Sequence, residues 1–86
     1  MAETIDIYTT DWCPYCAAAK GLLTKKGVTF REINAPAGSA ARAEAIERSG
    51  GRTTVPQIIA GTTALGGYDD IAALDRAGKL DALLGL

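Results

Sequence analysis

The sequence is poor in residues that bind metal ions. It contains no histidine, and its only two cysteines are Cys13 and Cys16. A structural zinc site usually takes four ligands from cysteine, histidine or carboxylate side chains. A zinc site within one chain is therefore not expected, and we predict no metal-binding residues.

The sequence also lacks long apolar runs and an excess of charge of either sign. No apolar stretch approaches the roughly 18 residues that a membrane span requires. The 9 basic and 10 acidic residues are interspersed and give a net charge of −1. Because there is no basic run and no interleaving of arginine with aromatic residues, neither nucleic acid nor membrane is an expected partner.

The length of the chain and its first residues set further expectations. A chain of 86 residues is expected to form one domain, residues 1–86. Residues 1–4 lead directly into a predicted strand, without the charged and apolar segments of a signal peptide, so none is expected. The expected location is the cytoplasm, where thiols are kept reduced and a disulfide is more often catalytic than structural.

The two cysteines form the motif Cys13-Pro14-Tyr15-Cys16 between a predicted strand and a predicted helix. In this context a Cys-x-x-Cys pair is typical of redox chemistry: one thiolate attacks a substrate disulfide, and the second thiol resolves the mixed disulfide. Half of a zinc site, a structural disulfide and a chance spacing are the alternatives. A disulfide across two residues closes too short a loop to stabilise a fold much.

The start of the predicted helix distinguishes the two sulfurs. Pro14 suits the first helical position, because its ring presets φ and its missing N–H has no partner there. The sulfur of Cys13 then faces the free N–H groups of Tyr15 and Cys16 and the positive end of the helix dipole. We therefore expect the pKa of Cys13 below the free value of roughly 8.5 and assign Cys13 as nucleophile. Cys16, one turn further and more buried, is assigned as the resolving thiol.

Hydrophobic periodicity and turn residues predict the order β-α-β-α-β-β-α. The βα units imply a parallel pair with a right-handed crossover, and the short Gly61-Thr62 link implies an antiparallel hairpin. The predicted fold class is α/β, a four-stranded mixed sheet with helices on both faces. The predicted strands are 4–9, 28–34, 55–60 and 63–65. The first predicted helix is 14–26, the second is capped by Ser39 and ends near Ser49, and the third is capped by Asp69 and ends near Gly78. A short turn at Leu80–Leu84 follows.

Three separated motifs together resemble the glutaredoxin family, in particular its small bacterial dithiol members. They are the cysteine motif, Thr54-Val55-Pro56, and the segment 66–70, Gly-Gly-Tyr-Asp-Asp. The resemblance covers essentially the whole chain, and the motifs follow one another in the expected order. It implies a thioredoxin-like fold and the activity of a glutathione-dependent thiol-disulfide oxidoreductase, an enzyme that reduces glutathione mixed disulfides and protein disulfides.

The resemblance also implies a glutathione-binding groove. The Val55–Pro56 bond is expected to be cis, so that Val55 can pair with an extended peptide such as glutathione. The N–H groups of Tyr68 and Asp69 are expected to hold the γ-glutamyl carboxylate and Asp70 its amine. The alternative role for Asp69 and Asp70 is simple N-capping of the helix. The alternative for Pro56 is that it only starts a strand, with a trans peptide bond. The predicted groove residues are Tyr15, Arg52, Thr54, Val55, Pro56, Gly67, Tyr68, Asp69 and Asp70.

One position departs from the family pattern. Glutaredoxins usually carry a lysine three residues before the nucleophile, where this chain has Thr10. That lysine helps to bind the glycine carboxylate of glutathione and favours the thiolate. Arg52 is the predicted replacement for the carboxylate contact, and Lys20 is interpreted as a solvated helix residue.

The resemblance further implies the partners of the reaction. No bound cofactor is expected, and glutathione serves as the reducing co-substrate, with glutathione reductase and NADPH upstream. The protein partners are glutathionylated or disulfide-containing proteins, and the chain is expected to be a monomer. One alternative is a carrier of an iron–sulfur cluster, but Pro14 argues against it, since such carriers usually have a smaller residue there. The second alternative function is that of a thioredoxin-like reductant, whose motif would normally be Cys-Gly-Pro-Cys.

Overall fold

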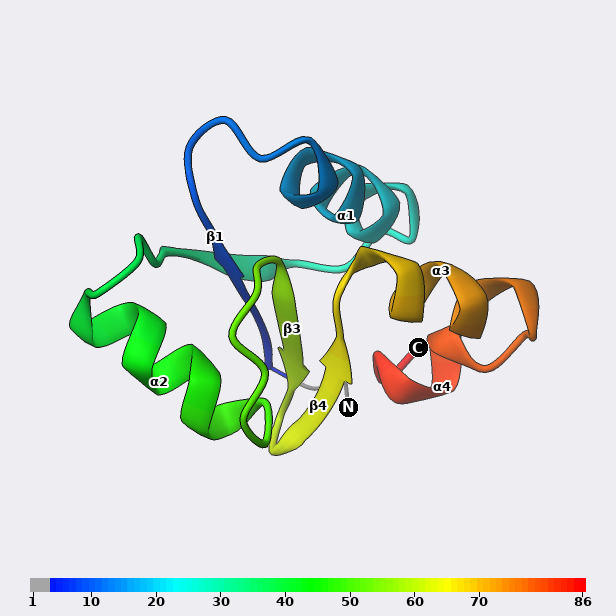
Figure 1. The fold of residues 1–86 in the computed structure, drawn as a ribbon. Helices are drawn as coiled ribbons and strands as arrows, with labels where there is room; N and C mark the ends of the chain where they lie inside the picture. The colour runs from blue at the N-terminus through cyan, green and yellow to red at the C-terminus, as the bar shows by residue number, and fades with distance from the viewer. Residues whose placement is uncertain (1–3) are drawn as a thin grey trace.

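The sheet is built around β1 (Ile5–Thr9), whose residues are all buried. In the computed structural model, which describes residues 4–86, the strand order is β2-β1-β3-β4 (Figure 1). β1 runs parallel to β2 and antiparallel to β3, and β3 runs antiparallel to β4, with a register shift between Ile58 and Ile59. The other strands are β2 (Phe30–Asn34), β3 (Gln57–Ala60) and β4 (Thr63–Gly66), and the helices are α1 (Pro14–Lys25), α2 (Ala40–Arg48), α3 (Tyr68–Arg76) and α4 (Leu80–Leu83).

Helices cover both faces of the sheet, as Figure 1 shows, with α2 on one side and α3 and α4 on the other. Side chains alternate along a strand, so Ile7 and Ile58 face the α1 and α3 side while Tyr8 and Ile59 face α2. The predicted α/β class and mixed four-stranded sheet are therefore confirmed. The larger core cluster contains Ile5, Ile7, Ala19, Leu23, Ile58, Ala60, Leu65, Ile71, Leu80 and Leu84, and the smaller one contains Tyr8, Ala35, Ala45 and Ile59.

The structure corrects some predicted boundaries. β2 begins at Phe30 and β3 at Gln57, each two residues later than predicted. The third helix is capped by Gly67 and not by Asp69. The Asp70 carboxylate accepts the Gly67 N–H at 2.9 Å and fixes the first turn two residues earlier than predicted. Of the segment 1–4 in which no signal peptide is expected, residues 1–3 lie outside the described residues.

A buried carboxylate joins the sheet to α2. The Asp6 side chain is 4% exposed and accepts hydrogen bonds from Arg31 at 3.1 Å and from Arg48 at 2.8 Å. Arg48 also donates to the Tyr8 hydroxyl and lies over the Tyr8 ring at 5.6 Å. Burial raises the pKa of Asp6, but the hydrogen bonds and charges of the two arginines outweigh it, so the pKa is lowered.

None of the helices in the described part of the chain, residues 4–86, is long and apolar enough to cross a membrane.

We expect Asp6→Asn to lower the free energy of unfolding at pH 7 by about 1.5–3 kcal/mol, the range for hydrogen bonds to a charged group. The folded-state pKa lies below the unfolded value of about 3.9. This contribution is therefore present above pH 3.9 and is lost as the pH falls through the folded-state pKa. Urea unfolding of both proteins at pH 7 and pH 3 measures it.

The matched control is Asp81→Asn, which removes an exposed carboxylate that pairs with Lys26. A surface pair contributes about 0–1 kcal/mol. Equal unfolding midpoints for Asp6→Asn and Asp81→Asn at pH 7 would contradict the assignment.

Candidate active site

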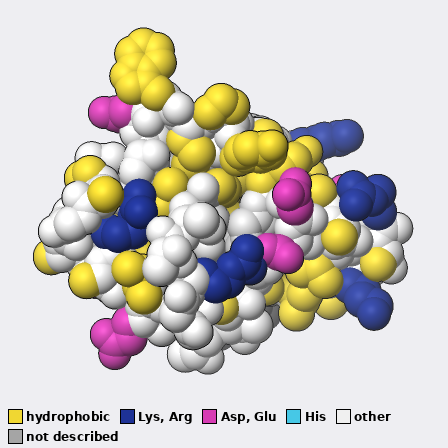
Figure 2. All heavy atoms as spheres, viewed as in Figure 1, with side chains coloured by type: hydrophobic (Ala, Val, Ile, Leu, Met, Phe, Trp, Pro, Cys, Tyr) yellow, Lys and Arg dark blue, Asp and Glu magenta, His cyan; other side chains and the backbone are white. Residues whose placement is uncertain are grey.

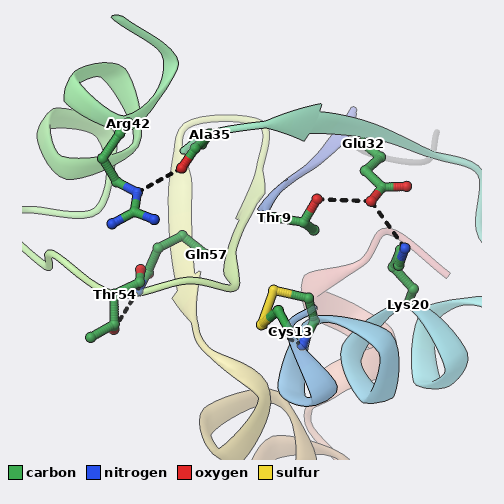
Figure 3. The surroundings of a disulfide bond; sticks show 9 residues. Thr9, Cys13, Lys20, Glu32, Ala35, Arg42, Thr54 and Gln57 are labelled. Atoms are coloured by element: carbon green, nitrogen blue, oxygen red, sulfur yellow. Dashed lines mark hydrogen bonds and ion pairs between the residues drawn. A yellow bond between two sulfur atoms is a disulfide. The ribbon is translucent and has the colours of Figure 1, made fainter. Parts of the chain in front are cut away.

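Cys13 and Cys16 form a disulfide at the start of α1 (Figure 3). Cys13 is the N-cap with extended backbone, Pro14 takes the first helical position, and the Cys16 N–H donates to Cys13 Sγ at 3.1 Å. Cys16 is 2% exposed, whereas Cys13 is half-buried. The predicted cap and the predicted difference in burial are both confirmed.

A groove of about 250 Å³ begins at Tyr15, the residue before Cys16; neither cysteine lines it. Three segments far apart in the sequence form it: the first turn of α1, the loop before β3, and the start of α3. The rings of Tyr15 and Tyr68 stand 6.5 Å apart, centroid to centroid, and link the first segment to the third. Every predicted groove residue lines it: Tyr15, Arg52, Thr54, Val55, Pro56, Gly67, Tyr68, Asp69 and Asp70.

The loop before β3 is held from two sides. The Val55–Pro56 peptide bond is cis, as predicted. Gln57 Nε2 donates to the Thr54 carbonyl at 2.9 Å (Figure 3). Arg42 of α2 donates to the Ala35 carbonyl at 2.8 Å and to the Thr53 carbonyl at 3.1 Å. These bonds fix the backbone of the loop against the sheet and α2.

The start of α3 combines backbone donors with a paired carboxylate. Asp70 Oδ2 accepts hydrogen bonds from the Gly67 N–H at 2.9 Å and from Arg52 Nη1 at 2.8 Å. These two contacts, first the Gly67 bond and then the Arg52 bond, lower the pKa of Asp70. The N–H groups of Tyr68 and Asp69, at the first two helical positions, have no partner within the helix and point out of its start. This end of the groove therefore offers donors for an anion beside an ionised carboxylate.

A second depression, of about 460 Å³, lies on the Thr10 side of the disulfide. Sequence reasoning missed it, because its members come from different elements. Lys20 is half-buried and donates to Glu32 Oε2 at 3.0 Å, and the same oxygen accepts from Thr9 at 2.8 Å (Figure 3). Lys20 therefore lies at the surface of α1, as interpreted, with 36% of its side chain exposed, but it is paired with Glu32. The lining residues are Thr10, Asp11, Trp12, Cys13, Pro14, Cys16, Ala17, Lys20 and Glu32.

Arg52, the predicted replacement for the lysine that is absent at Thr10, lies in a different hollow from Thr10. Arg52 lines the groove and is paired with Asp70, whereas Thr10 lines the second depression. The hydrogen bond from Thr9, and then that from Lys20, lower the pKa of Glu32.

Within residues 4–86 no group of three or more histidine, cysteine, aspartate or glutamate side chains is arranged to hold a metal ion.

The comparisons with known proteins agree with this geometry. The sequence model of the glutaredoxin family matches residues 5–64. The chain is 60% identical over 78 residues to a glutaredoxin of Pseudomonas aeruginosa, covering 91% of this chain and 92% of that protein. It is 52% identical over 80 residues to glutaredoxin 3 of Escherichia coli K12, covering 93% and 95%. A buckwheat glutaredoxin–glutathione complex is similar in structure, with a TM-score of 0.83 and 27% identity, covering 96% of this chain and 77% of that one.

The fold and the paired cysteines define a thiol-disulfide oxidoreductase with a thioredoxin-like fold. The chain belongs to the glutaredoxin family and is a glutathione-dependent thiol-disulfide oxidoreductase of the dithiol type. The resemblance that the three sequence motifs indicated is thereby confirmed.

We expect Gly66→Ala to destabilise the protein more than Gly78→Ala does. Both glycines have positive φ, at 100° and 74°, so each substitution strains the backbone by about 1–2 kcal/mol. A Cβ at Gly66 would also collide with the Asp70 carboxylate and the Arg52 guanidinium, whereas one at Gly78 meets nothing within 4 Å. The collision adds about 1–3 kcal/mol.

Urea unfolding measures the difference between the two variants. In Gly66→Ala the displaced Asp70 carboxylate should also lose its bonds to Gly67 and Arg52, so that its pKa rises toward the ordinary value. An NMR titration of the carboxyl carbon measures this pKa. An unchanged Asp70 titration in a destabilised Gly66→Ala protein would show that the carboxylate has kept its place.

Proposed function

We propose that Cys13 is the nucleophile and Cys16 the resolving thiol, and that the enzyme reduces both glutathione mixed disulfides and protein disulfides. The observation that carries this proposal is the asymmetry of the pair. Cys13 caps α1 with its sulfur on a backbone N–H and is half-buried, whereas Cys16 is 2% exposed. Helix N-termini stabilise the thiolate, and an attacking sulfur has to be accessible.

With a glutathionylated protein, Cys13 alone is sufficient for the proposed reaction. The Cys13 thiolate attacks the glutathione sulfur, the bond to the protein sulfur breaks, and the protein leaves as a thiolate that takes a proton from water. A second glutathione thiolate then attacks the same glutathione sulfur, releasing glutathione disulfide and the Cys13 thiolate. One free glutathione is consumed for each mixed disulfide: its sulfur replaces the protein sulfur in the disulfide, the products are the protein thiol and glutathione disulfide, and the enzyme is unchanged.

With a protein disulfide, the proposed reaction needs both cysteines. Cys13 forms a mixed disulfide with one substrate sulfur while the other leaves as a thiolate. Cys16, as a thiolate, then attacks Cys13 Sγ, which closes the Cys13–Cys16 disulfide and releases the second substrate sulfur. Two glutathione molecules reopen that disulfide. The Cα atoms of the two cysteines are 5.1 Å apart in the closed state.

Glutathione is proposed to bind in the groove of about 250 Å³. The N–H groups of Tyr68 and Asp69 would hold the γ-glutamyl carboxylate, and Asp70, whose pKa is lowered, would hold the amine as a carboxylate. Val55 would pair with the backbone of the peptide. Arg52 would contact a glutathione carboxylate from its place beside Asp70, with Tyr15, Thr54, Pro56 and Gly67 completing the walls. The buckwheat glutaredoxin that is similar in structure is a complex with glutathione, which supports this assignment.

The wider setting is proposed on the same grounds. The whole chain, residues 1–86, would form one glutaredoxin domain that works as a monomer in the cytoplasm. Glutathione is its reducing co-substrate, and glutathione reductase with NADPH regenerates glutathione. The high coverage of the bacterial relatives, at 92% and 95% of their lengths, supports the proposed single domain.

We expect Cys13→Ser to abolish all activity and Cys16→Ser to keep the removal of glutathione from mixed disulfides while losing the dithiol reduction of protein disulfides. The physical reason is that only Cys13 combines accessibility with the helix N-terminus. Turnover of a small glutathione mixed disulfide, coupled to glutathione reductase and NADPH oxidation, measures the first activity, and loss of a protein disulfide measures the second. If Cys16→Ser lost the first activity as completely as Cys13→Ser, the assigned roles would be wrong.

We expect Thr10→Lys to lower the pKa of Cys13 by a fraction of a unit. A partly exposed charge pair contributes about 0.2–1 kcal/mol, and one pKa unit corresponds to about 1.36 kcal/mol. The backbone N–H groups at the start of α1 remain in both proteins and should dominate. Thiolate absorbance against pH, measured with Cys16 replaced by serine, gives the pKa.

The matched control for Thr10→Lys is Thr62→Lys, which adds the same charge at the exposed turn between β3 and β4. It should leave the Cys13 pKa unchanged. A fall of two units or more in Thr10→Lys would mean that the side-chain charge outweighs the helix end. A value near that of free cysteine in the native protein would contradict the role of the helix end altogether.

A further inference from the structure

Trp12 has an unusual backbone and an unusual exposure. Its φ is 57°, and within residues 4–86 it is the one residue other than glycine with a positive φ. Its side chain is 99% exposed. A bulky residue with positive φ is a true outlier, and such outliers concentrate at functional sites. The conformation turns an indole ring into solvent immediately before Cys13.

The surface beside Trp12 carries a negative charge without a counterion. The β1–α1 loop is at the top of the view in Figure 1, and there Figure 2 shows a hydrophobic side chain projecting from the surface with an acidic one beside it. Asp11 is exposed and makes no ion pair with the described residues 4–86, whereas Glu32 in the same depression is paired with Lys20. An aromatic face next to a free carboxylate suits a guanidinium group, which stacks on indole and bonds to carboxylate.

We propose that Trp12 and Asp11 form a docking surface for the polypeptide that flanks the reactive cysteine of a protein disulfide, and that this surface selects arginine on that flank. The inference rests on the proposed role of Cys13 as nucleophile. Consecutive Cα atoms are about 3.8 Å apart, so a substrate cysteine that is bonded to Cys13 Sγ brings its neighbouring residues within reach of Trp12.

The position of the surface predicts which substrates depend on it. Trp12 and Asp11 line the second depression, and neither lines the groove proposed for glutathione. In the step that is affected, the bond between Cys13 Sγ and a substrate sulfur forms and the other substrate sulfur leaves. An arginine on the flank stabilises this mixed disulfide by its contact with the ring. A glutathione mixed disulfide with a small thiol has no such flank.

The test uses disulfide-closed synthetic peptides that differ in one residue beside the reactive cysteine, which is arginine, serine or glutamate. The rate constant for reduction by the fully reduced native protein should be about two- to fivefold higher for the arginine peptide than for the serine peptide. This is the range expected from one exposed cation–π contact. The glutamate peptide should be the slowest, and the preference should shrink as salt is added.

Four variants locate the effect. Trp12→Asn removes the ring but keeps a residue that tolerates positive φ, and it should equalise the arginine and serine peptides, while Trp12→Phe should restore part of the preference. Asp11→Asn should weaken the preference and its salt dependence. Leu86→Ala, which truncates another exposed hydrophobic residue, should behave as the native protein. Turnover of the small glutathione mixed disulfide should be the same in all of them.

A direct readout comes from fluorescence, because Trp12 is the only tryptophan in the chain. In the mixed disulfide that the Cys16→Ser protein forms with each peptide, Trp12 emission should change with the arginine peptide and not with the serine peptide. Equal rates for the three peptides with the native protein would overturn the proposal. So would an equal loss on all substrates in Trp12→Asn, which would place Trp12 in the chemistry of Cys13 itself. Failure of the proposed function would appear separately, as no turnover of the glutathione mixed disulfide by the native protein.

Discussion

The direction of the strands brings the reactive parts of this protein together. β1 is antiparallel to β3, and β3 is antiparallel to β4, so the end of β1, the start of β3 and the end of β4 meet at one edge of the sheet. From that edge the chain enters α1 at Cys13, passes the Pro56 loop and enters α3 at Gly67. Because β1 and β3 are buried throughout, this edge is held rigidly. Two helix N-termini therefore open next to the disulfide, and the groove lies between them.

The helix ends supply this site with its positive character, since the side-chain cations that line the two hollows are each paired with a carboxylate, and Asp11 is a further carboxylate without an ion pair among residues 4–86. Asp70 is paired with Arg52 in the groove, and Glu32 is paired with Lys20 in the second depression. Backbone N–H groups are fixed by the fold and cannot be neutralised by a flexible partner, so they can stabilise negative charge on sulfur or on a carboxylate. If Cys13 is the nucleophile as proposed, the start of α1 stabilises its thiolate without the lysine that the family usually carries at the position of Thr10.

Much of the fold could be predicted from the sequence, because hydrophobic periodicity, turn residues and the cysteine motif at a strand-to-helix boundary are local signals. The cis bond at Pro56 and the groove residues were expected only from the resemblance to the glutaredoxin family, because the local sequence alone also allows a trans strand start and simple N-capping. The cap of α3 was misplaced for a local reason as well. Asp69 has the chemistry of a cap, but Gly67 followed three residues later by Asp70 is half of a capping box, and that signal would have located the helix start.

The pairs that join distant segments could not be predicted in this way. Arg52 and Asp70 are 18 positions apart, and Arg48 and Asp6 are 42 apart. Nothing in the composition of either segment specifies its partner, since each pairing depends on which face of the sheet the two elements cover. The same is true of Lys20 and Glu32, and for this reason the second depression was missed. The exposure of Trp12 depends on a positive φ for which a tryptophan gives no sequence signal.

The two outer strands of the sheet bear on how the protein behaves at high concentration. β2 is one border, and its exposed Arg31 and Glu32 side chains are charged. β4 is the other; it has four residues, and the register shift in its pairing with β3 disturbs its line of backbone groups. Charge, brevity and irregular pairing are the devices by which natural sheets discourage a second molecule from adding a strand. Neither border of the sheet therefore offers a long, regular line of free backbone groups on which another molecule could add a strand.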